Sequence, residues 1–86
     1  MMKVPREKDV MKGFNMLMKI DTARPYSEVA KEWNKYVRFT RKYDSVAYFD
    51  IVEKFLKNDE ELERDVNHKL EMIEATLIVG QYVREA

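Results

Sequence analysis

The residues best suited to chemistry lie in the last third of the sequence, where acidic side chains surround the only histidine. His68 follows Asp65 by three residues, a spacing that places both side chains on one face of a helix. Carboxylates and imidazoles bind metals, but a di-iron helical bundle needs a Glu-x-x-His from each of two helices and two further glutamates. A single Asp-x-x-His supplies too few ligands. We therefore predict neither a metal site nor a cofactor.

Five glutamates form a second acidic pattern, E-E-x-E followed by E-x-x-E; they are Glu60, Glu61, Glu63, Glu71 and Glu74. The pattern resembles the magnesium-binding acids of MazG-like nucleotide pyrophosphohydrolases. The resemblance implies carboxylates that hold Mg²⁺ against substrate phosphates. In that family the acids come from separate helices and face an aspartate, whereas here all five fall on one predicted helix. The sequence also has no Gly-rich phosphate loop. We predict a non-enzymatic protein, with nucleotide hydrolysis as the third hypothesis.

A basic band is the most ordered pattern in the chain. At about 100° per residue, the apolar residues of the segment 27–43 fall on one side of a helix. Cations fall on the opposite side: Lys31, Lys35, Arg38 and Lys42, with Phe39 and Arg41 at the edges of the band. The cations could neutralise phosphates while Phe39 stacks on a base. An ordinary solvated face is the alternative, because Glu28 and Glu32 lie nearby.

The elements that must position these residues are all predicted to be helices. Glycine occurs only at positions 13 and 80, proline only at 5 and 25, and β-branched runs with hairpin turns are missing. We predict an all-α, four-helix bundle-like domain spanning residues 1–86. Its expected helices cover residues 5–21, 27–43, 46–57 and 59–85.

Several local signals indicate helix ends and packing. Ser27 is the expected N-cap of the second helix and Asp44, with Ser45, of the third. Asn58, with Glu61 three residues later, resembles a capping box for the last helix. Gly13, inside the first helix, indicates a close approach of a neighbouring helix. We expect the segment 46–49, Trp33 and Tyr36 to lie in the core, and Tyr26, Phe39 and Tyr43 to be exposed.

The long last helix carries two apolar faces. Leu62, Val66, Leu70, Ile73 and Leu77 recur every three or four residues, as in a core-facing stripe. A second set lies on a different side and is predicted to serve self-association: Met72, Ala75, Val79, Tyr82 and Val83. Three short helices do not obviously cover so much apolar surface.

Charge divides the chain into two halves. The formal net charge is zero, yet residues 1–43 carry a net charge of +6 and residues 44–86 a net charge of −6. The halves could neutralise each other by packing together. Alternatively, the basic half could face an anionic partner, or two copies could meet basic to acidic. Cysteine is absent, and we expect neither a signal peptide nor a membrane span, which suits a cytoplasmic protein.

Together these patterns predict a small cytoplasmic protein that binds another protein through surface complementarity, as a homodimer. Adaptors, regulators and the small inhibitory proteins of phages fit this description by analogy of class alone. Sequence-independent nucleic-acid binding through the basic band is the alternative hypothesis.

Overall fold

The computed structural model describes residues 2–85, and the side chains of residues 2–81. The described residues form four helices: α1 (Glu7–Met18), α2 (Tyr26–Thr40), α3 (Ser45–Asn58) and α4 (Glu60–Glu85). The described residues form no β-strand beyond an isolated bridge between Lys3 and Tyr43. The prediction of an all-α, four-helix fold with a long last helix is confirmed.

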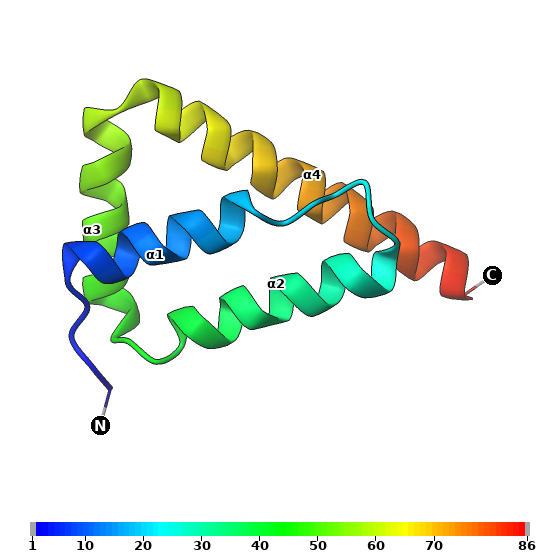
Figure 1. Cartoon of the computed structure of the whole chain (residues 1–86), viewed down its shortest axis with the longest axis horizontal. Coiled ribbons are helices and arrows are strands. Elements are labelled where there is room, and N and C mark those ends of the chain that lie inside the picture. Colours follow the sequence, from blue (N-terminus) through cyan, green and yellow to red (C-terminus); the bar gives the residue numbers. More distant parts are fainter. Residues whose placement is uncertain (1, 86) are drawn as a thin grey trace.

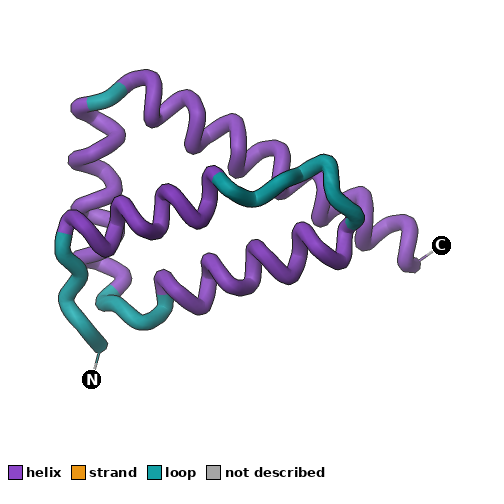
Figure 2. Tube along the Cα trace, in the orientation of Figure 1, coloured by secondary structure: helices purple, strands orange, loops and turns teal. Residues whose placement is uncertain are grey.

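The helices form a flat assembly. In Figure 1, α2, α3 and α4 make the three sides of an open triangle, and α1 crosses in front of α3 and lies over the middle of the triangle. α1 contacts each of the other three helices. The Cα atoms extend over 42 × 33 × 17 Å, so the third dimension has room for only about two layers of helices, each about 10 Å in diameter. Figure 2 shows the connection between α1 and α2 as a longer loop than the turns on either side of α3.

The helix ends follow capping rules, although two predicted caps are wrong. Asp44 caps α3 as expected, since its side chain accepts a hydrogen bond from the backbone N–H of Val46 at 3.3 Å. α2 begins at Tyr26 after Pro25, without a side-chain cap, so Ser27 is not its N-cap. α4 is capped by Asp59 instead of Asn58: the Asp59 carboxylate accepts from the N–H of Leu62 at 3.0 Å.

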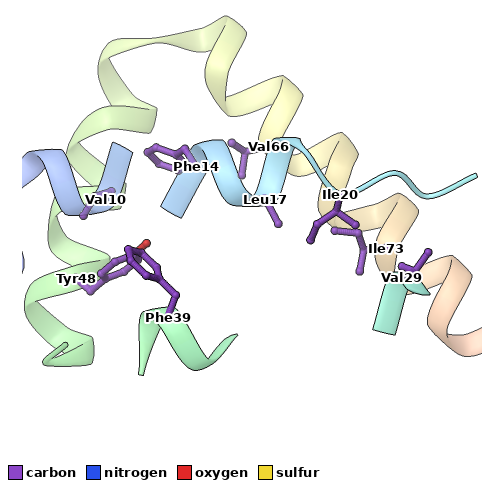
Figure 3. Packing of buried hydrophobic residues seen from close by; sticks show 9 residues of the cluster. All are labelled: Val10, Phe14, Leu17, Ile20, Val29, Phe39, Tyr48, Val66 and Ile73. Carbon is purple, nitrogen blue, oxygen red and sulfur yellow. The ribbon is translucent and has the colours of Figure 1, made fainter. Parts of the chain in front are cut away.

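The core lies between α1 and the triangle. Three residues of α1 and the following Ile20 point into it, and each of the other helices adds one or two (Figure 3). The buried apolar side chains are Val10, Phe14, Leu17, Ile20, Val29, Phe39, Tyr48, Val66 and Ile73. Because α1 contributes so many of them, burying its stripe is what holds the three-sided frame together.

Gly13 marks the close approach that its sequence position predicts. It lies against the Tyr48 hydroxyl of α3, and a Cβ at this position would overlap that hydroxyl and lie 3.4 Å from the Phe39 ring of α2. α1 thus crosses α2 and α3 at a glycine, where it has no side chain to keep the helices apart. Beyond the other end of α1, the Lys69 ammonium of α4 donates a 2.7 Å hydrogen bond to the carbonyl of Ile20.

The core prediction for the segment 46–49 needs correction. Tyr48 is buried, but Val46 is 79% and Phe49 62% exposed, because these residues lie on sides of α3 that face away from α1. Trp33 and Tyr36, predicted to lie in the core, are half-buried and pack against it, with their rings 5.4 Å apart. The residue pattern of one helix gives a direction for each side chain, but not the presence of a neighbour in that direction.

Candidate protein interaction surfaces

The basic band lies on the exposed side of α2 and continues into the turn after Thr40, where Arg41 and Lys42 lie. Its four cations, Lys31, Lys35, Arg38 and Lys42, are all exposed, as is Arg41 at the edge. Among the described side chains, only Lys35 in this group forms an ion pair, with Glu32 at 3.4 Å. Lys31, Arg38, Arg41 and Lys42 form no ion pair with a described acidic side chain and present their charge to solvent.

Phe39 does not lie at the surface, contrary to the prediction. It is only 7% exposed, because α1 crosses α2 at this position and covers its ring. The Lys12 ammonium of α1 lies 5.6 Å from the ring centroid and that of Lys42 lies 6.0 Å away, both within cation–π range. Phe39 is thus not free to stack on a base. Lys12, which the sequence reasoning missed, extends the basic band onto α1.

A row of aromatic rings connects the end of α2 to the start of α3. Phe39 contacts Tyr43, Tyr43 stacks on Tyr48, and Tyr48 contacts Phe49, with centroids 5.6 to 5.9 Å apart. Burial raises the pKa of Tyr48 above its ordinary value, and nearby phenol and carboxylate groups raise it further. Burial, assisted by Asp9, also raises the pKa of Tyr43. Both phenols therefore stay neutral at physiological pH. Tyr26 and Tyr43, predicted to be exposed, are half-buried, and the Tyr26 ring packs against Gly80.

The acidic residues around His68 lie on the exposed surface of α4. A shallow depression there is lined by Glu60, Glu63, Arg64, Asn67, His68 and Glu71. All of its residues come from this one helix. Within the part of the chain that the structure describes, no three His, Asp or Glu side chains converge as a metal site would require.

The second apolar face of α4 is exposed as far as the structure describes it. Met72, Ala75 and Val79 all lie at the surface, and Val79 is 61% exposed. The side chains of Tyr82 and Val83, predicted to belong to the same face, lie outside the described residues. This face is one stripe on the outer side of a single helix.

The two charged halves do not neutralise each other through ion pairs. The ion pairs among the described side chains join Asp21 and Glu28 to Arg24, Glu32 to Lys35, and Asp50 to Lys54. Each pair is exposed, local in sequence and contained within one half. Basic and acidic surfaces are therefore both left open to solvent.

Two apolar depressions lie on surfaces that α1 does not reach. The first, of about 330 Å³, lies between α2 and α4 and is lined by Trp33, Leu70, Ile73, Glu74, Leu77 and Ile78. The second follows α3 and is lined by Ser45, Val46, Phe49, Asp50, Val52, Glu53 and Leu56. Sequence reasoning missed this surface, although Phe49, Val52 and Leu56 follow a second helical stripe on α3 that could have indicated it.

Comparisons with known proteins give no match to a family model, a curated protein or a solved structure. No helix in the described part of the chain combines the length and the apolar character needed to cross a membrane.

Proposed function

We propose that this chain is a non-enzymatic interaction protein that binds an acidic surface of another protein through the basic band of α2. The observation that carries the proposal is that the described ion pairs leave the +6 half and the −6 half unconnected. Charges paired within the fold would be unavailable to a partner. Lys31 and Arg38 are exposed and make no ion pair with a described side chain, so they can meet a complementary surface, which favours specificity and fast association.

The test is retention of proteins from a lysate of the native host by the immobilised chain. Three baits are compared: wild type, Lys31→Glu with Arg38→Glu on α2, and Lys54→Glu with Lys57→Glu on α3. The two double variants change the net charge equally. We expect specific proteins to be retained by wild type and by the α3 variant, released by moderate salt, and lost with the α2 variant. Identical retention by all three baits would contradict the proposal.

Sequence-independent nucleic-acid binding remains the second candidate, and one observation favours it. Lys12 of α1 brings a further cation to the Phe39 ring, which Lys42 also approaches, and so widens the basic surface from α2 onto α1. Retention that disappears after nuclease treatment of the lysate would support this candidate over direct protein binding. Its affinity should fall steeply with salt, because phosphate contacts release counterions. A wild-type chain that is not retained on DNA or RNA at low salt would exclude it.

A further inference from the structure

We infer that a second copy of this chain packs on the face of the α2–α3–α4 triangle opposite α1, which we call the open face. The open face is defined by four residues at its two depressions: Trp33, Phe49, Leu70 and Ile78. The inference rests on the proposed function in one respect only, the view that this chain acts through its surfaces. The partner on the open face is a different molecule from the target of the basic band.

Contacts of α1 show which face it covers. On α3, residues Pro5 to Glu7 line a depression together with Ile51 and Phe55. At about 100° per residue, Ile51 lies some 60° to one side of the buried Tyr48, and Phe49 lies about 100° to the other side. Phe49 therefore points away from α1.

The same geometry applies to α4. Lys69 reaches the carbonyl of Ile20, just after α1, and so marks the α1 side of this helix. Leu70 lies about 100° and Ile78 about 180° around the helix from Lys69. Both are exposed, at 36% and 47%. Trp33 completes the surface from α2, since it lines the same depression as Leu70 and Ile78. The only tryptophan of the chain is thus half-buried at an apolar depression.

The molecule exposes more surface than a compact monomer of its size. Its accessible surface is 6651 Å², whereas a folded monomer of 10.4 kDa exposes about 5,400 Å². The Cα radius of gyration is 14.0 Å, against about 12 Å for a compact domain of 86 residues. The excess, on the order of 1,200 Å², exceeds the roughly 800 Å² that each partner buries in a standard interface. A face measuring 42 × 33 Å between Cα extremes is large enough to provide that area.

The charges around the open face favour a second copy as the occupant. The α3 and α4 edges carry acids near the depressions that form no ion pair with a described side chain, Glu53 on α3 and Glu74 on α4. The α2 edge carries Arg41, which makes no ion pair with a described side chain. A two-fold axis repeats every contact twice, so the basic edge of each copy can meet an acidic edge of the other. The net charge of zero means that two copies do not repel each other overall.

The second apolar face of α4, which includes Met72, Ala75 and Val79 and which we call the outer stripe, supplies a matched control. Val79 is 61% exposed and Phe49 is 62% exposed, so Val79→Glu and Phe49→Glu place the same charge at apolar positions of equal accessibility. Ile78→Glu provides a second variant on the open face, on a different helix, for the case that Phe49→Glu disturbs folding. Far-UV circular dichroism establishes that each variant remains helical.

The experiment measures molecular mass in solution by light scattering over a range of concentrations, with the fluorescence of Trp33 as a local reporter. We expect wild type and Val79→Glu to have twice the 10.4 kDa mass of the chain. Phe49→Glu and Ile78→Glu should have the mass of the monomer. Trp33 emission should shift to shorter wavelength as wild type associates, because water leaves the depression.

Two results would overturn the inference: a wild type that stays monomeric at high concentration, or a dimer that Val79→Glu abolishes while both open-face variants retain it. The second result would place self-association on the outer stripe of α4. If no dimer forms but lysate proteins are still retained through Lys31 and Arg38, the inference fails and the proposed function stands. If the dimer forms but that retention is absent, the proposed function fails and the inference stands.

Discussion

At the scale of single residues, Gly13 determines how closely the helices approach. A glycine inside a helix costs about 1 kcal/mol relative to alanine, so its presence in α1 requires a compensating contact. The compensation is the Tyr48 hydroxyl, which occupies the space of the missing Cβ, with the Phe39 ring beside it. The same close crossing buries Phe39, which the pattern of α2 alone places at the surface. One small residue on α1 thus decides the exposure of an aromatic side chain on α2.

This contact predicts the effect of Gly13→Ala. The higher helix propensity of alanine would stabilise α1, but the new methyl group overlaps the buried Tyr48 hydroxyl, and overpacking of this kind costs about 1–3 kcal/mol. We expect a net loss of about 1 kcal/mol in the free energy of unfolding, measured by urea denaturation. In a chain that already carries Tyr48→Phe, Gly13→Ala should cost much less, because the hydroxyl that the new methyl group overlaps is absent. Asn15→Ala, at an exposed position of α1, should not destabilise; a stabilised Gly13→Ala would contradict the close packing.

At the scale of the helices, capping side chains decide where one element ends and the next begins. Asn58 and Asp59 stand next to each other between α3 and α4 but serve different helices. The Asn58 amide donates to the carbonyl of Lys54 within α3 at 2.9 Å. The Asp59 carboxylate accepts from the N–H of Leu62 in α4 and places a negative charge at the positive end of the long helix.

The division of roles predicts a clear asymmetry between two alanine substitutions. Asp59→Ala should lower the free energy of unfolding by about 1 kcal/mol, the usual cost of losing an N-cap. Asn58→Ala should change it by less than about 0.5 kcal/mol, as expected for an exposed position without a capping role. Urea denaturation of both variants gives the comparison. If Asn58→Ala lowers the free energy of unfolding as much as Asp59→Ala or more, Asn58 is the N-cap of α4.

The same boundary shows what sequence reasoning can and cannot provide. The helix count, the long α4 and the Asp44 cap could be predicted, because periodicity and capping are properties of short segments. The N-cap of α4 is Asp59, whereas the sequence predicts Asn58, because these two adjacent residues are both favourable N-caps. The exposure of Phe49 depends on where α1 passes, a contact between segments far apart in the chain. The basic band could be predicted for its own helix, but the contribution of Lys12 could not.

At the scale of the whole molecule, opposite charges are separated instead of paired. Residues 1–43 carry eleven Lys and Arg against five Asp and Glu, and the described ion pairs are all exposed and local. Such pairs contribute little stability each, typically below about 0.5 kcal/mol. Like charges meanwhile follow each other at helical spacing on α1 and α2: Lys8 and Lys12, and Lys31 and Lys35. The separation leaves charge available for partners, at a cost to the stability of the fold.

This cost predicts that added salt stabilises the protein. Each like-charged pair at i and i+4 destabilises a helix by about 0.2–0.5 kcal/mol, so screening both pairs should raise the free energy of unfolding by about 0.4–1 kcal/mol. Urea denaturation at low protein concentration, with and without added sodium chloride, measures the effect. The variant Lys8→Gln with Lys31→Gln removes one cation from each pair at positions without a described ion pair. It should be more stable than wild type at low salt and respond less to added salt. A wild type that loses stability as salt is added would mean that attraction between the basic and acidic halves holds the fold together, because screening weakens attraction and repulsion alike.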